Sequence, residues 1–169
     1  MRHKRGPGIE SGAMTCSCLL RLALVAVAGV TAASMSGSVQ AATPEEQAVL
    51  APIQAMFDGM AKRDAVAIKE PTLPGGMMVL MRDGKPTQMT FEDFAARVGK
   101  PGKTQIQERI HDPLVKIDND LAMVWAPFEF LSDGKVDHCG TDLFNLVRKD
   151  GKWLIASVAD TGRKDCGAQ

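Results

Sequence analysis

The sequence contains no tyrosine, and aromatic residues make up only 5% of its 169 positions. Any mechanism that depends on a phenolic hydroxyl group is therefore excluded. No cluster or stripe of lysine and arginine appears, which argues against a nucleic-acid-binding protein. A Cys-x-x-Cys spacing is also missing, and beyond the N-terminal segment no apolar run is long enough to span a membrane.

The N-terminal segment has the features of a secretory leader. Basic residues, the last of them Arg21, precede a short apolar run over residues 22–30, and small residues follow as far as Val39-Gln40-Ala41. A run of about ten apolar residues is too short for a membrane anchor. We expect residues 1–41 to be a cleaved signal peptide and residues 42–169 to form one periplasmic or secreted domain. Translation could begin at Met1 or at Met14.

Removing this leader changes the charge and the cysteine count. Of 20 basic and 20 acidic residues, four and one lie in residues 1–41, which leaves 16 basic against 19 acidic residues, or −3. Two cysteines remain, Cys139 and Cys166, and a disulfide between them would close a loop of about 27 residues. Two free thiols, or a metal pair with His138, are the alternatives. Since only two histidines remain, we expect a disulfide, no metal site and no cofactor.

Three helices are predicted. The first opens the mature chain, and the other two follow it. Thr43 to Glu46 has the pattern of a capping box with proline at the first helical position, and an apolar stripe then continues to Met60. Pro52 should kink this first helix. Asp64 should cap a second helix over residues 65–70, and a third should span residues 91–98 and end at Gly99.

The remaining residues predict strands joined by tight turns. Residues 71–76 are expected to be a loop before a strand at 77–81, and antiparallel strands follow from Thr104 onward. Pro127 should mark a bulge or a sheet edge. Aspartate-glycine pairs, such as Asp150-Gly151, predict hairpins. The fold class is therefore α+β, with helices on one face of a curved, mainly antiparallel sheet.

One strand carries polar side chains on an apolar face. Because side chains alternate across a strand, His138 and Asp142 should share a face with Phe144 and Leu146. An imidazole with a carboxylate beside it can take up or release a proton. The same pattern also fits a buried hydrogen-bonded pair without activity, or a pair at a solvent-facing sheet edge.

Three segments carry a resemblance to a known family. They are His138-Cys139-Gly140-Thr141-Asp142-Leu143-Phe144, Asp150-Gly151-Lys152-Trp153 and Ala159-Asp160-Thr161. With the helices at 43–62 and 91–98, they resemble the nuclear transport factor 2-like superfamily, in particular its small secreted SnoaL-like or lumazine-binding-like members. The resemblance implies a cone-shaped α+β fold, a homodimer, and a pocket lined by Trp125, Phe128, His138, Asp142, Phe144 and Trp153.

The resemblance implies more than one function, because this superfamily contains enzymes and non-enzymes. The first is binding of a small apolar or aromatic molecule. The second is isomerase, dehydratase or cyclase chemistry by His138 with Asp142 or Asp160. The third is a homodimeric interaction module without a ligand. Ketosteroid isomerase and scytalone dehydratase use tyrosines, so their mechanisms do not transfer to this chain, whereas a cyclase-like route through histidine and aspartate stays open.

Overall fold

The computed structural model describes residues 41–167, so the predicted leader lies outside the described residues apart from Ala41. In this range α1 spans Pro44–Lys62 and starts with the expected capping box, in which Glu46 N donates to Thr43 Oγ1 at 3.2 Å. Pro52 lies inside this helix, on its buried face, and the kink there stays a prediction. The early turns of α1 are thus specified by residues that are adjacent in sequence.

Two shorter helices follow and also begin at the expected caps. Asp64 accepts hydrogen bonds from two backbone N–H groups at the start of α2 (Ala65–Lys69). Thr90 caps α3 (Phe91–Val98), which ends at Gly99. In the part of the chain that the structure describes, no helix is long and apolar enough to cross a membrane.

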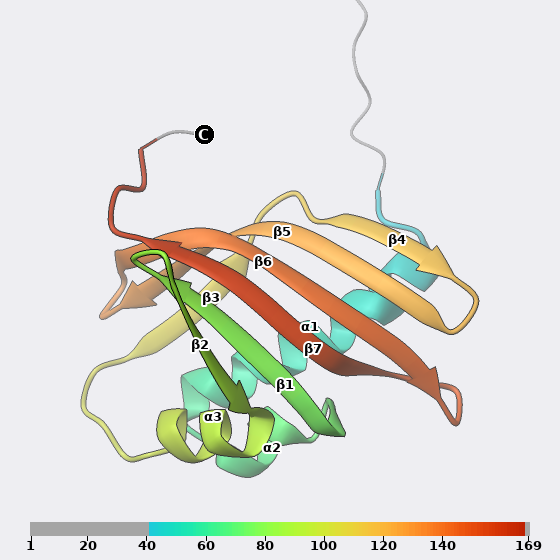
Figure 1. The fold of residues 1–169 in the computed structure, drawn as a ribbon, viewed down its shortest axis with the longest axis horizontal. Coiled ribbons are helices and arrows are strands. Elements are labelled where there is room, and N and C mark those ends of the chain that lie inside the picture. Colours follow the sequence, from blue (N-terminus) through green and yellow to red (C-terminus); the bar gives the residue numbers. More distant parts are fainter. Residues whose placement is uncertain (1–40, 168–169) are drawn as a thin grey trace, which may run out of the picture. The chain divides into compact units, whose positions relative to one another are not determined.

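Within residues 41–167, seven strands form one curved, open sheet, and the helices cover one side of it (Figure 1). The order is β2-β1-β7-β6-β5-β3, and β4 also pairs with β5. The pairing is antiparallel except between β1 and β7, which run parallel. The strands are β1 (Thr72–Arg82), β2 (Lys85–Thr90), β3 (Ile106–Ile110), β4 (Leu114–Asp118), β5 (Leu121–Ser132), β6 (Lys135–Lys149) and β7 (Lys152–Arg163). The predicted α+β fold is confirmed.

The hairpin turns follow the sequence closely. At Asp83-Gly84, Asp133-Gly134 and Asp150-Gly151 both residues have positive φ, between 49° and 76°. This conformation matches the twist of antiparallel strands, and aspartate followed by glycine is well suited to it. These local turns set the register of three strand pairs.

The structure corrects the predicted loop before β1 and locates Pro127 in the sheet. Residues 72–76, expected to be a loop, belong to β1, because the strand reaches back to pair Thr72 with Ile155 across an irregular stretch. Pro127 lies within β5 where the outer neighbour changes from β3 to β4, and its carbonyl accepts from His111 N at 2.8 Å. Its missing N–H therefore falls in the gap between two short edge strands.

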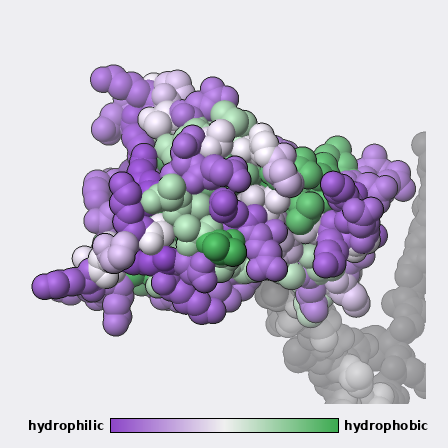
Figure 2. All heavy atoms as spheres, turned by 90° about the horizontal axis from the view of Figure 1, so that it is seen from below, coloured by the Kyte–Doolittle hydropathy of each residue, from purple (hydrophilic) through white to green (hydrophobic). Residues whose placement is uncertain are grey.

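The core fills the space between α1 and the inner face of the sheet. Val49, Ile53 and Phe57 of α1 pack with inward residues of the central strands, and the rings of Phe57 and Phe144 meet edge to face at 6.1 Å. The outer face of the sheet is less covered and exposes Leu121 and Trp125. Seen from the end where α2 and α3 lie, the surface is mainly hydrophilic (Figure 2).

Candidate functional site

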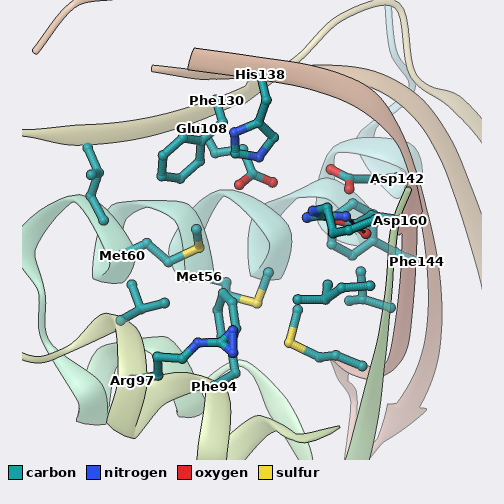
Figure 3. A pocket seen from close by; sticks show the side chains of 16 residues that line it. Met56, Met60, Phe94, Arg97, Glu108, Phe130, His138, Asp142, Phe144 and Asp160 are labelled. Atoms are coloured by element: carbon teal, nitrogen blue, oxygen red, sulfur yellow. Dashed lines mark hydrogen bonds and ion pairs between the residues drawn. The ribbon is translucent and has the colours of Figure 1, made fainter. Parts of the chain in front are cut away.

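A cavity of about 200 Å³ lies between the helices and the inner face of the sheet (Figure 3). Most of its wall is apolar and comes from α1, α3 and the five strands β1, β3, β5, β6 and β7. The apolar lining comprises Met56, Met60, Met78, Leu80, Phe94, Val98, Ile106, Phe130, Phe144 and Val158. Six polar side chains complete it, namely Arg82, Arg97, Glu108, His138, Asp142 and Asp160. An apolar wall with a few convergent polar groups is typical of a small-molecule site.

Strand register places the polar groups side by side. Asp142 on β6 lies directly opposite Asp160 on β7, and on the other side Glu108, Phe130 and His138 form a row across β3, β5 and β6. Residues directly opposite in an antiparallel pair have Cβ atoms only about 4.5–5.5 Å apart. Two adjacent aspartates would repel each other if both were ionised, so at least one must be neutralised.

Arg82 neutralises Asp160. Its Nη1 and Nη2 donate to Oδ1 and Oδ2 of Asp160 at 2.6 and 2.7 Å, and the Met81 backbone N–H adds a 3.3 Å bond. Gly162 leaves room for this side chain, since a Cβ there would lie 2.7 Å from Arg82 Nε. This hydrogen-bonded pairing raises the pKa of Arg82. Asp160 is thus already engaged by a bidentate arginine.

Asp142 has no such cation. Its side chain is almost fully enclosed, with 1% exposure, and among the described residues no N–H or O–H group reaches its Oδ2. Burial raises the pKa of Asp142 well above its ordinary value, and the charges of Glu108 and Asp160 raise it further. The proton therefore neutralises this carboxyl in the folded protein.

Glu108 is the carboxyl whose charge acts on Asp142. Burial, and then the charge of Asp160, raise the pKa of Glu108 to about 8, and the charge of Glu108 in turn raises the pKa of Asp142. Two neighbouring carboxyls whose pKa values are both raised hold at least one proton between them at neutral pH. At neutral pH the cavity thus contains a carboxyl pair that can both donate and accept a hydrogen bond.

His138 lies at the same end of the cavity. It does not pair with Asp142, although the sequence predicts that pairing. Its Nδ1 contacts Asp137 Oδ2 at 2.9 Å, and Lys164 Nζ binds the same oxygen at 2.9 Å. The hydrogen bond from His138, followed by that from Lys164, lowers the pKa of Asp137. Since an ionised carboxylate only accepts, Nδ1 carries the proton in this contact. The ring stacks on Phe130 at 4.8 Å.

The predicted site residues fall into two groups. His138, Asp142, Phe144 and Asp160 all line the cavity, whereas three aromatic residues lie elsewhere. Trp125 is on the outer face of the sheet and 50% exposed, because it alternates with the buried Val124 and Ala126. Phe128 is buried and meets the His138 ring edge to face at 5.8 Å.

Trp153 is the third aromatic residue outside the cavity. It belongs to the core, where the guanidinium of Arg148 lies 4.5 Å from its ring centroid. A register shift between β6 and β7 follows Ile155, so Trp153 and Ile155 face inward on one side of it while Val158 and Asp160 do so on the other. Trp153 thus faces inward as predicted, but it lies at the far end of β7 from the cavity residue Asp160.

Sequence reasoning missed Arg82, Arg97 and Glu108. For Glu108 a signal was available, since it stands between Ile106 and Ile110 on the inward-facing positions of β3. Arg82 reaches the cavity only through the parallel pairing of β1 with β7. No pattern near Arg82 in the sequence indicates that pairing.

The two cysteines of the described chain are joined. Cys139 and Cys166 form a disulfide with their Cα atoms 5.8 Å apart and 27 positions apart in sequence, as the sequence predicts. The bond attaches the C-terminal segment to β6 at the residue after His138. In residues 41–167 no group of three or more His, Cys, Asp or Glu side chains could hold a metal ion.

Comparisons with known proteins agree with this architecture. The family model described as "Putative lumazine-binding" matches residues 44–159. A nuclear transport factor 2-like protein from Cytophaga hutchinsonii superposes with a TM-score of 0.61 at 15% identity, covering 72% of this chain and 100% of that one. A putative dehydratase of the same superfamily from Streptomyces avermitilis gives 0.57 at 17%, covering 72% and 99%. These likenesses show the fold alone, and no curated protein matches the sequence.

Proposed function

The chain belongs to the family described as "Putative lumazine-binding", and from that premise we propose that it binds a small, mainly apolar or aromatic molecule in the cavity around Glu108 and Asp142. The observation that carries this proposal is the cavity itself, whose mainly apolar wall brings the polar groups of Glu108, His138 and Asp142 together. This combination is typical of a small-molecule site. A ligand that forms hydrogen bonds with these groups would offset the cost of burying them, about 1–3 kcal/mol for each unpaired group.

The dimensions of the cavity limit the ligand. At about 200 Å³ the cavity is smaller than the roughly 300–1,000 Å³ pockets that hold drug-sized molecules. The methionines in its wall adapt to different shapes, since the side chain is unbranched and polarisable. The ligand is therefore compact, with a body of one or two rings.

Occluding the cavity tests the binding proposal. Val98 is partly exposed at the cavity wall on α3, so Val98→Trp should fill the space without disturbing the deeper core. Val66 on α2 is 73% exposed and outside the cavity, so Val66→Trp is the matched control. Native mass spectrometry of protein purified without reducing agent should show a bound small molecule in the wild type and Val66→Trp, and none in Val98→Trp. An adduct retained equally by all three would place the ligand elsewhere.

An enzyme of the isomerase, dehydratase or cyclase type is the second candidate. Its support is the pKa of Glu108, which at about 8 lies close to neutral pH and so suits an acid or base. His138 and Asp142 line the same cavity, whereas Asp160 is held by Arg82. Glu108→Gln should then abolish turnover of an identified substrate while binding persists. Unchanged turnover in this variant would eliminate the acid–base role.

Export and self-association complete the proposal. Export through the leader at residues 1–41 is supported by the sequence pattern and by the Cys139–Cys166 disulfide, which suits an oxidising compartment. A homodimer through the outer face of the sheet is supported by its exposed hydrophobic residues, Leu114, Leu121, Trp125 and Val136. Trp125→Glu should convert that dimer to a monomer in light scattering. The intact mass of the exported protein should correspond to a chain that begins near Ala42.

A further inference from the structure

We infer that the ligand has two unlike ends, an anionic group at α3 and a neutral group with both a hydrogen-bond donor and an acceptor at the carboxyl pair. The inference rests on the proposed binding function and names the chemistry that this cavity selects. It comes from the distribution of charge along the cavity wall, where the strand side and the α3 side carry opposite kinds of group.

The strand end of the cavity disfavours an anion. Three carboxyls meet there, those of Glu108, Asp142 and Asp160, and Arg82 is already bidentate to Asp160. A carboxylate of the ligand placed against Glu108 and Asp142 would add a further negative charge in a desolvated space. A hydroxyl, lactam or amide group can instead accept the acidic proton of the pair and donate to its free oxygen.

The helix end carries an available cation. Arg97, in the last turn of α3, is exposed to solvent and lines the cavity, on the same side of it as Phe94 in Figure 3. Within residues 41–167 its guanidinium donates to no protein oxygen, and no carboxylate lies within 4.0 Å of it. Four other described arginines donate hydrogen bonds to protein groups, namely Arg63, Arg82, Arg109 and Arg148. The remaining one, Arg163, lies outside this cavity.

An apolar body connects the two ends. Between Arg97 and the carboxyl pair, the wall is formed by methionine and phenylalanine side chains, including Met56, Met60 and Phe94 (Figure 3). A planar guanidinium is well matched to a carboxylate and binds it with two parallel hydrogen bonds. An aromatic acid with a hydroxyl group at its far end therefore represents the ligand class.

Matched acids and amides test the inference. We would titrate the purified oxidised protein at pH 7 with para-hydroxybenzoate and para-hydroxybenzamide, and with the longer para-hydroxyphenylpropionate and its amide, which sample the distance between the ends. The methyl groups of isotopically labelled methionines report the site, because Met56, Met60 and Met78 line the cavity whereas Met89 and Met123 do not. The acid of at least one pair should bind about tenfold more tightly than its amide, as for a charge-assisted contact.

Two variants assign the preference to the arginine. Arg97→Gln should remove the advantage of the acid and leave the affinity for the amide unchanged. Arg163→Gln makes the same chemical change outside the cavity and should keep that advantage. Replacing the para-hydroxyl group by a methoxy group, which cannot donate, should weaken binding to all three proteins about tenfold.

The outcomes separate this inference from the proposed function. If amides and acids shift the cavity methionines with equal affinity, or if the preference survives in Arg97→Gln, the two-ended ligand is wrong while small-molecule binding stands. If no compound shifts Met56, Met60 or Met78 at millimolar concentration, this ligand class is wrong, and an adduct that the wild type retains and Val98→Trp loses in native mass spectrometry would still support small-molecule binding. A stronger effect of Arg163→Gln than of Arg97→Gln would also overturn the assignment of the anionic end.

Discussion

Replacing Glu108 with glutamine removes one of the two carboxyls in the cavity and preserves the size of the side chain. In the unfolded chain this carboxyl ionises near its ordinary pKa of 4.5, and in the folded protein its pKa rises to about 8. Between these values the folded state holds a proton that the unfolded state has lost. The free energy of unfolding of the wild type should therefore fall as the pH rises through this range.

The size of the effect follows from the same pKa difference. One extra proton bound by the folded state gives a slope of about 1.36 kcal/mol per pH unit. From pH 4.5 to about 8 the loss reaches a ceiling of about 5 kcal/mol. Glutamine does not titrate, and the uncharged amide also removes the repulsion that raises the pKa of Asp142. At pH 8 Glu108→Gln should be more stable than the wild type by about 2–4 kcal/mol, and near pH 5 the two should be about equal.

Urea unfolding between pH 5 and pH 8.5 measures this difference, with the disulfide kept oxidised. Glu92→Gln is the control, since Glu92 lies on the exposed side of α3 and pairs only loosely with Lys69 at 3.8 Å. Its pH profile should run parallel to that of the wild type. If Glu108→Gln keeps the full wild-type slope, or is the less stable protein at pH 8, the protonated carboxyl pair does not exist.

Three further predictions concern stability. Gly140→Ala would place a Cβ 1.7 Å from the Thr161 carbonyl oxygen, so it should cost at least about 3 kcal/mol, whereas Gly167→Ala should be silent in the same urea assay. Cys166→Ser opens the 27-residue loop and should cost about 3.5 kcal/mol; stability equal to that of the oxidised wild type would contradict the disulfide. Arg82→Met leaves the buried Asp160 without its cation and should cost about 2 kcal/mol, since Arg82 is 39% exposed; adding Asp160→Asn should recover part of the loss.

The helices and turns could be predicted because their determinants lie within a few residues. Thr43, Asp64 and Thr90 cap helices through hydrogen bonds to N–H groups two or three positions ahead. Aspartate-glycine pairs adopt positive φ without a distant partner.

The candidate site was predictable only where alternation is regular. On β6 the pattern correctly placed His138, Asp142 and Phe144 at the cavity. It wrongly placed Trp153 at the cavity, because Trp153 faces inward but lies at the other end of β7 from Val158 and Asp160 and joins the core there. It also paired His138 with Asp142, whereas a register shift between β5 and β6 leaves Asp137 as an extra residue beside His138, and its carboxylate reaches the ring.

By itself, then, the sequence determined the helices, the tight turns, the fold class and the pairing of two cysteines. Only the tertiary structure decided which charged groups meet. Arg82 binds Asp160 across 78 positions because β1 joins β7 in parallel, and Glu108 meets Asp142 because β3 lies across β5 from β6. Local contacts are specified by neighbouring residues, whereas long-range pairing depends on how much apolar surface the whole sheet buries against α1. The carboxyl pair is a product of that packing.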